Sequence, residues 1–326
     1  MIPHGTAWAR LSCALFALVT LDAAAQDAPQ EWLERMNRAI EELNYEGTFV
    51  HVLGNHSETM HIVHRNDNGR ISERLSSRDG VGREIIREED IVKFILPEQR
   101  LVLVEARTDA SELRSALPGY CVELEPHYEF RMGAGTRVAD RPVNVVSIKP
   151  KDEYRYGYTL YLDRETAMPL KSLLLNERGE IIEQIVFTEI RISDAISPSA
   201  LQSAIDTQGF ELLEPERQRT EEIPLSAPEW RPSMLPPGFR LSAATQSAIG
   251  GSDYPVSHLV YSDCLATVSV FIEDPKTDTD VSEGFSSLGS TNAYSRKLNG
   301  RSATVVGEVP RQTVRSIALS LSLTAE

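Results

Sequence analysis

Residues 154–187 read YRYGYTLYLDRETAMPLKSLLLNERGEIIEQIVF, and this stretch decides the fold class. Apolar and polar residues alternate in three runs, and the turn-like segments DRET and NERG separate them. Asp163 and Thr166 can cap the first turn with their side-chain oxygens, and Pro169 restarts the next strand. The first run places four large side chains on one face of its strand: Tyr156, Tyr158, Leu160 and Leu162. Successive short strands joined by tight turns predict an antiparallel sheet.

The same period of two extends in both directions along the chain. Strand-like runs with turn signals between them occupy residues 47–54, 58–65, 69–77, 83–88, 90–96, 99–106, 128–133, 142–149 and 180–192. Almost no helix lies between these runs, which argues against βαβ units. A sheet of this size must curl or stack. We therefore predict an α+β fold whose large antiparallel sheet forms an unclosed β-barrel, followed by a smaller α/β domain at the C-terminus.

A helix is predicted over residues 30–44, QEWLERMNRAIEELN. At helical spacing, one face gathers Trp32, Met36, Ala39, Ile40 and Leu43. An amphipathic helix buries such a face against another element. We expect it to cover the concave side of the large sheet.

The first residues have the pattern of a secretory signal peptide. Arg10 precedes the apolar run LSCALFALVTL, and AAAQ offers a cleavage site between Ala25 and Gln26. A lipid anchor at Cys13 is rejected, because that residue lies inside the apolar run. The mature protein is therefore expected to be secreted across the inner membrane.

Four segments follow from composition. Residues 1–25 are the signal peptide, 26–200 the large β domain, 201–228 a linker and 229–326 the small domain. The linker prediction rests on the charged, proline-bearing run EPERQRTEEIPLSAPEW. In the small domain, Asn299-Gly300 predicts a two-residue hairpin turn. The last residues, IALSLSL, fit helix and strand alike, and we choose helix.

Charge and cysteine content restrict the function classes. The net charge of −15 opposes binding to nucleic acid or to a bare anionic membrane. After cleavage only Cys121 and Cys264 remain. They lie in different predicted domains, so free thiols are favoured and an interdomain disulfide is the alternative. Against the acidic background, residues 284–325 hold five bases and only one acid, Glu308. These bases are candidates for a partner-binding surface, although a solvated face is the commoner meaning of such a run: Arg296, Lys297, Arg301, Arg311 and Arg315.

No catalytic motif is found: the chain lacks GxSxG, a phosphate loop, HExxH and paired CxxC. The best metal-like group lies on the first predicted hairpin and comprises His51, His56, His61 and His64. His61 and His64 differ in parity, so a regular strand points them to opposite faces. We expect no enzyme activity, no cofactor and no metal.

The apolar face of the 154–162 run opposes the predicted helix. Periodicity alone favours ordinary core packing there. A sheet face covered by one helix also suits a cavity for an acyl chain. The candidate lining residues are Trp32, Met36, Ile40, Tyr156, Tyr158, Leu160 and Leu162.

Several segments together resemble the RseB/MucB family of periplasmic regulators of the extracytoplasmic stress sigma factor (the sigma-E/AlgU type). They are LNYEGTFVHV, YEFRMGAGTRVADRPVNVVSIKPKD, YRYGYTLYLDRETAMPLKSLLL, MLPPGFRL and VVGEVPRQTVRSIA. Two turn positions depart from the family pattern or from easy turn geometry: Ala167 stands where relatives often have glycine, and Cys264 where glycine would be easier.

The resemblance implies a lipoprotein-carrier-like large domain. It also implies a partner, the periplasmic domain of an RseA/MucA-like transmembrane anti-sigma factor, which the protein shields from regulated proteolysis. Lipopolysaccharide or another acylated lipid would release the partner. Self-association is left open. The alternative function is a periplasmic lipid or lipoprotein carrier without a regulatory partner.

Overall fold

The computed structural model describes residues 28–80, 82–106, 112–115, 117–214, 223–248, 255–273 and 283–323. The predicted signal peptide lies outside the described residues. Within them, no helix is both long and apolar enough to cross a membrane.

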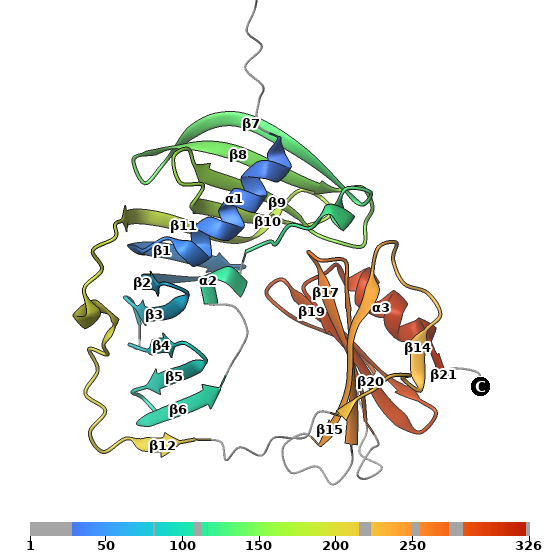
Figure 1. The fold of residues 1–326 in the computed structure, drawn as a ribbon. Helices are drawn as coiled ribbons and strands as arrows, with labels where there is room; N and C mark the ends of the chain where they lie inside the picture. The colour runs from blue at the N-terminus through green and yellow to red at the C-terminus, as the bar shows by residue number, and fades with distance from the viewer. Residues whose placement is uncertain are drawn as a thin grey trace, which may run out of the picture.

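The first sheet has 12 strands in the order β12-β6-β5-β4-β3-β2-β1-β11-β10-β9-β8-β7. Every neighbouring pair is antiparallel except β12 with β6. Figure 1 shows the sheet curving from β7–β10 at the top to β4–β6 and β12 at the lower left. The predicted large antiparallel sheet is confirmed. The barrel is not, because among the described strands the sheet stays open between β7 and β12.

We call this sheet and its helices the large domain. Its strands are β1 (Tyr45–Leu53), β2 (His56–Asp67), β3 (Arg70–Ser77), β4 (Glu84–Glu88), β5 (Ile91–Leu96), β6 (Leu101–Ala106), β7 (Tyr128–Val138), β8 (Arg141–Pro150), β9 (Gly157–Asp163), β10 (Pro169–Leu175), β11 (Ile181–Ile192) and β12 (Glu211–Leu213). Its helices are α1 (Pro29–Glu42), α2 (Glu112–Ser115), η1 (Val122–Leu124) and η2 (Pro198–Leu201).

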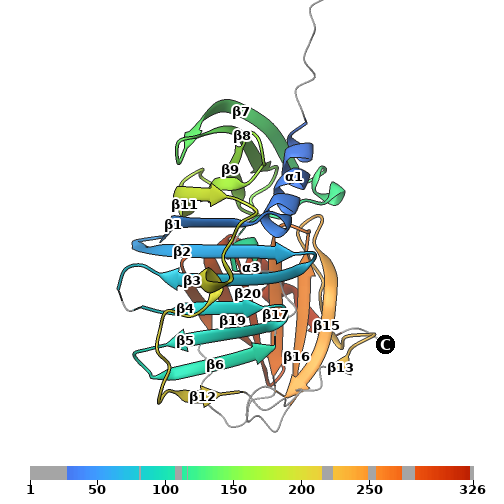
Figure 2. The same ribbon diagram turned by 60° about the vertical axis from the view of Figure 1, so that its left-hand side comes forward.

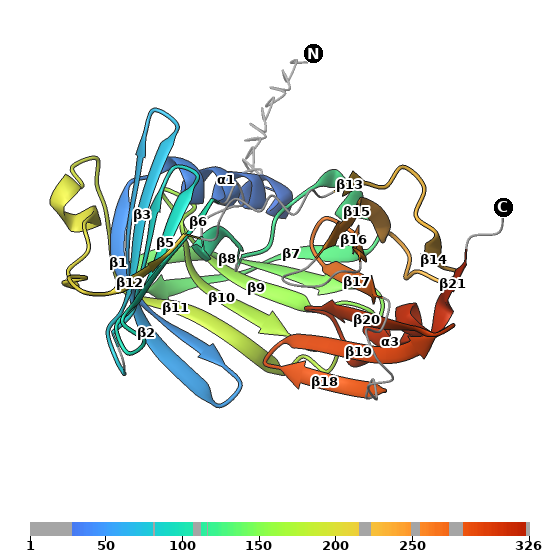
Figure 3. The same cartoon turned by 90° about the horizontal axis from the view of Figure 1, so that it is seen from below.

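Helix α1 confirms the predicted amphipathic helix. Pro29 stands at its first position, where a missing N–H costs nothing. Its buried side chains are Trp32, Leu33, Met36, Ala39 and Ile40. They join the core formed by the sheet, and Figure 3 shows α1 lying across the strands.

Strands β9, β10 and β11 are the three strands predicted from residues 154–187. At the first turn, the carboxylate of Asp163 accepts hydrogen bonds from the backbone N–H groups of Glu165 and Thr166 and from the Thr166 hydroxyl. Arg141 pairs with the same carboxylate, with Nε 2.7 Å from Oδ2. Burial raises the pKa of Asp163, but these bonds outweigh it and hold the pKa below its usual value. Ala167 takes a φ of 62°, so this turn does hold a left-handed residue without glycine.

The second sheet has seven strands in the order β13-β15-β16-β17-β20-β19-β18, all antiparallel. With α3 and the pair β14-β21 it forms what we call the small domain, which lies behind the large sheet in Figure 2. The elements are β13 (Ile223–Pro224), β14 (Trp230–Pro232), β15 (Arg240–Ala248), β16 (Pro255–Ser262), β17 (Thr267–Glu273), β18 (Gly284–Leu288), β19 (Thr291–Leu298), β20 (Arg301–Gly307), α3 (Arg311–Ser320) and β21 (Leu321–Leu323). A separate apolar core fills it.

Three local predictions in the C-terminal half have clear outcomes. Asn299 and Gly300 turn the β19–β20 hairpin with φ of 50° and 82°, as predicted. The ambiguous C-terminal run is both structures in succession: helix to Ser320, then strand from Leu321. Parts of the predicted linker are paired rather than loose, because β12 joins β6 and β13 joins β15.

Candidate functional site

The predicted lipid-lining residues lie in two places. Five of them belong to the packed core of the large domain and are at most 4% exposed: Trp32, Met36, Ile40, Leu160 and Leu162. Tyr158 is half-buried and packs against the same core. Tyr156 lies elsewhere, because it precedes β9 and its hydroxyl accepts a hydrogen bond from Asn292 of the small domain, at 3.0 Å. Burial raises its pKa to about 12.

The core face of the large sheet continues beyond these residues toward β6. Leu75 stands opposite Ile85, Ile85 opposite Phe94, and Phe94 opposite Leu103, so the four share one face of β3–β6. Leu75 is buried, whereas the other three are half-buried. We call Ile85, Phe94 and Leu103 the inner apolar row. Sequence analysis did not single it out, since only strand pairing aligns residues so far apart.

The two domains are joined by a disulfide between Cys121 and Cys264, whose Cα atoms lie 6.3 Å apart. The prediction of free thiols is therefore wrong. Cys121 immediately precedes η1 in the large domain, and Cys264 lies in the β16–β17 turn of the small domain with a φ of 82°. The two domains meet at this turn, where Leu265 packs against the core of the large domain. The two cysteines lie in different domains, as predicted, but the contact between the domains brings them close enough to bond.

Next to the disulfide, a buried ion pair crosses the domain junction. The Nη1 of Arg155 lies 2.5 Å from Oδ2 of Asp263, and both side chains are fully buried. Arg155 also donates to the carbonyl oxygen of Pro237 at 2.5 Å. Tyr128 donates its hydroxyl to the same Asp263 oxygen at 2.9 Å. Burial, with Asp263 alongside, raises the pKa of Tyr128 well above its usual value.

At the other end of the junction, two carboxyl groups share a serine. The Ser290 hydroxyl contacts Glu183 of β11 at 3.0 Å and also contacts Glu308, which follows β20. His51 of β1 lies 2.9 Å from Glu183. Burial and the neighbouring Glu183 raise the pKa of Glu308. Burial also acts to raise the pKa of Glu183, but hydrogen bonds from His51 and Ser290 bring it below its usual value.

The five predicted partner-binding bases do not form one uniform surface. Arg296 donates to the carbonyl oxygens of Ala318 and Leu319 at 3.3 and 3.2 Å, so it caps the end of α3. Arg301 pairs with Glu229 at 3.1 Å. Arg311 lies over the Phe285 ring, with Cζ 4.4 Å from the centroid. Lys297 and Arg315 are exposed.

The four histidines do not form one site: three lie beside different glutamates, and the fourth is exposed. His64 is buried, lies 3.1 Å from Glu73 and stacks on Tyr45. His61 lies on the opposite face, 3.4 Å from Glu46, as its parity predicted. His56 is exposed. Among the described residues, the one group of three potential metal ligands is Cys121, Glu123 and Cys264, and its two sulfur atoms already bond to each other.

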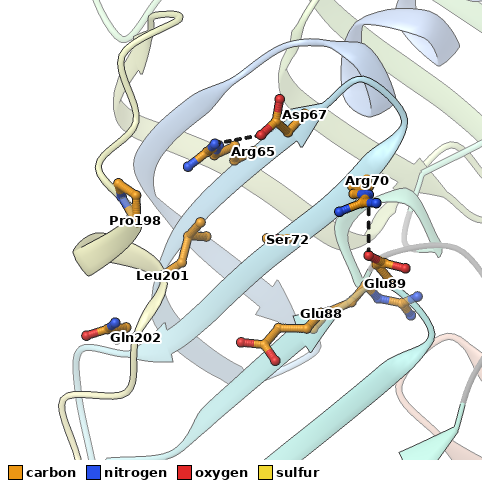
Figure 4. A pocket seen from close by; sticks show the side chains of 10 residues that line it. Arg65, Asp67, Arg70, Ser72, Glu88, Glu89, Pro198, Leu201 and Gln202 are labelled. Carbon is orange, nitrogen blue, oxygen red and sulfur yellow. Dashed lines mark hydrogen bonds and ion pairs between the residues drawn. The ribbon is translucent and has the colours of Figure 1, made fainter.

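A hollow of about 470 Å³ lies on the large domain between β2–β4 and η2 (Figure 4). Its charged side chains pair with one another, since Arg65 lies 2.8 Å from Asp67 and Arg70 lies 3.8 Å from Glu89. Such a polar, self-paired lining does not suit an acyl chain.

The comparisons with known proteins match most of the chain. The family model for the MucB/RseB N-terminal domain matches residues 28–205, and that for the MucB/RseB C-terminal domain matches residues 224–322. The sigma factor AlgU regulatory protein MucB of Pseudomonas aeruginosa is 34% identical over 314 residues, covering 94% of this chain and 95% of that protein. The sigma-E factor regulatory protein RseB of Escherichia coli is 25% identical over 312 residues, covering 94% and 95%.

Solved structures agree. MucB in complex with MucA(peri) superposes with a TM-score of 0.70 at 32% identity, covering 91% of this chain and 99% of that one. MucB alone superposes with a TM-score of 0.59 at 29% identity, covering 90% and 97%. With both of its domain models matched in order and a relative above 30% identity along nearly its full length, the chain belongs to the MucB/RseB family.

Proposed function

We propose that this protein binds the periplasmic region of a transmembrane anti-sigma factor, shields it from regulated proteolysis and releases it when an acylated envelope lipid binds. The proposal places the mature chain in the periplasm. The observation that carries it is the similarity to MucB along the whole chain, including MucB in its complex with MucA(peri). The relatives are named as regulatory proteins.

The exposed bases of the small domain support an electrostatic contribution to partner binding. Lys297 and Arg315 are exposed, and Arg311 is held above Phe285 at the start of α3. Arg296 is a poorer choice for mutation, because its guanidinium caps α3. Removing Arg296 would alter the fold as well as the surface charge.

The test is a binding titration with the anti-sigma periplasmic region from the same bacterium. The variant Lys297→Glu/Arg315→Glu is expected to bind more weakly than wild type, with a smaller dependence of affinity on salt. Lys149→Glu, an exposed base of the large domain, is the charge-change control. Equal affinity of the double variant and wild type would remove these bases from the interface, and no binding by wild type would refute the function.

For the lipid, we propose that an acyl chain enters along the inner apolar row and extends into the neighbouring core of the large domain. The core candidates Trp32, Met36, Ile40, Leu160 and Leu162 are already packed together, so an acyl chain has to displace them. Ile85 is half-buried and packs against that core. Each buried methylene contributes about 0.8 kcal/mol, which allows a long chain to compensate for the displacement.

Neighbouring residues on opposite faces of β6 provide a matched test of lipid entry. Leu103 belongs to the inner apolar row, and Val104 points to the other face; both are half-buried. Leu103→Lys is expected to reduce displacement of the partner by lipopolysaccharide, whereas Val104→Lys leaves it near the wild-type level. Equal lipid sensitivity of the two variants excludes this entry. Lipid binding without any partner binding would instead favour a lipid carrier.

A further inference from the structure

The disulfide is the one covalent link between the two domains apart from the chain itself, within the described residues. It closes a sequence separation of 143 residues. Cys264 is exposed and Cys121 is half-buried, so a small thiol in solution can reach the bond. An accessible disulfide between two separately packed domains is placed to control how they sit together.

The surrounding contacts depend on the same turn. Asp263 precedes Cys264, accepts hydrogen bonds from the backbone N–H groups of Leu265 and Ala266, and pairs with Arg155. Cys264 itself holds a left-handed φ, a conformation that costs a non-glycine residue energy. When the disulfide opens, the residue next to the ion pair loses its anchor to the large domain.

Beyond the Cys264 turn, where Leu265 packs against the large-domain core, much of the junction is polar. Its middle contains bonds from Asn292 to the Tyr156 hydroxyl and from Thr313 to the backbone carbonyl of Tyr154. Its far end contains the carboxyl pair Glu183 and Glu308 around Ser290. When the junction opens, water can replace these polar contacts, so they contribute little net stability. The disulfide therefore contributes much of what keeps the domains together.

The whole-chain superposition distinguishes two MucB structures. This chain superposes better on MucB in its complex with MucA(peri) than on MucB alone, at similar sequence identity and coverage. Thus the whole chain superposes more closely on MucB in the complex, with a TM-score of 0.70 against 0.59.

We propose that the Cys121–Cys264 disulfide is a redox-sensitive clamp that holds the two domains in the arrangement that binds the partner. The proposal rests on the anti-sigma binding proposed above. A dithiol opens the clamp: it supplies two electrons and two protons, the S–S bond breaks into two thiols, and the dithiol becomes a disulfide. If the reduced chain spends about a tenth of its time in the binding arrangement, its apparent affinity falls about tenfold.

The experiment compares three samples: oxidised wild type, wild type reduced with dithiothreitol, and Cys121→Ser/Cys264→Ser without reductant. Small-angle scattering reports the domain arrangement of the free chain. Titration with the anti-sigma periplasmic region reports affinity. The serine variant with added dithiothreitol controls for effects of the reductant on the partner, and circular dichroism verifies that each sample is folded.

The expected result is a wider distribution of dimensions and about tenfold weaker binding in both samples without the disulfide. Unchanged scattering, or equal affinity with and without the bond, overturns the clamp. Failure of oxidised wild type to bind the partner refutes the proposed function instead. Even if the partner does not bind, scattering that is unchanged after reduction excludes the clamp.

Discussion

Arg155→Met is the perturbation that probes the domain junction most sharply. Arg155 is fully buried and pairs with the fully buried Asp263 across the two domains. Methionine keeps much of the side-chain volume but leaves the Asp263 carboxylate without its cation. Removing one partner of a buried pair costs about 3–5 kcal/mol. Asp263 keeps its bonds from Tyr128, Leu265 and Ala266, which places the expected loss toward the lower end of that range.

The assay is urea unfolding of the oxidised protein, followed by the fluorescence of Trp32 in the large domain and Trp230 in the small domain. The control is Arg131→Met, whose pair with Glu129 is as short, at 2.5 Å, but has side chains 70% and 42% exposed. That exposed pair contributes at most about 1 kcal/mol. Equal losses of unfolding free energy in the two variants would refute the role given to the buried pair.

Three further predictions concern the same junction. A protease site inserted between Glu214 and Ile223 is expected to yield, after cleavage, two folded pieces that separate on a denaturing gel only after reduction. Pieces that separate on that gel without reductant would exclude the disulfide. Glu308→Gln is expected to become more stable relative to wild type as pH rises from the ordinary glutamate pKa of 4.5 through the raised pKa of folded Glu308. The reason is that the wild type must ionise Glu308 next to Glu183 over this range, whereas glutamine stays neutral. A difference in unfolding free energy between the two proteins that stays constant from pH 4 to 8 contradicts this. Gly289→Ala is expected to cost more than Gly179→Ala in thermal unfolding, since both have positive φ but only at Gly289 would a Cβ meet Leu53, at 2.6 Å; equal costs would mean that this approach yields freely.

The sheets were predictable because their information is local. Alternation at β9–β11, the capping Asp163 and the Asn299-Gly300 turn are read within a few residues of the chain. Helix α1 was predictable for the same reason. Its apolar face is written at helical spacing, and burial of Trp32, Met36 and Ile40 follows from it.

The junction could not be predicted, because its contacts join residues about a hundred positions apart. Arg155 and Asp263 each look like ordinary surface charges in the sequence, and only the packing of the β16–β17 turn against the large domain buries them. The same packing brings Cys121 to Cys264. The one local sign of a buried arginine was its place between two tyrosines at 154–156, and this pattern does not show which residue it pairs with.

Strand β12 was missed for a different reason. It is a short parallel edge strand with exposed Leu212 and Leu213, so it has neither alternation nor a hairpin turn to mark it. Its charged surroundings resemble a linker. The inner apolar row was missed because each of its residues comes from a different strand.

The most direct test of the proposed function is calorimetric titration of the oxidised chain, without residues 1–25, with the periplasmic region of the anti-sigma factor from the same bacterium. The account predicts a saturable complex that weakens as salt rises and that added lipopolysaccharide dissociates. A titration without saturable binding at low salt, by protein whose two domains are shown to be folded, would contradict it.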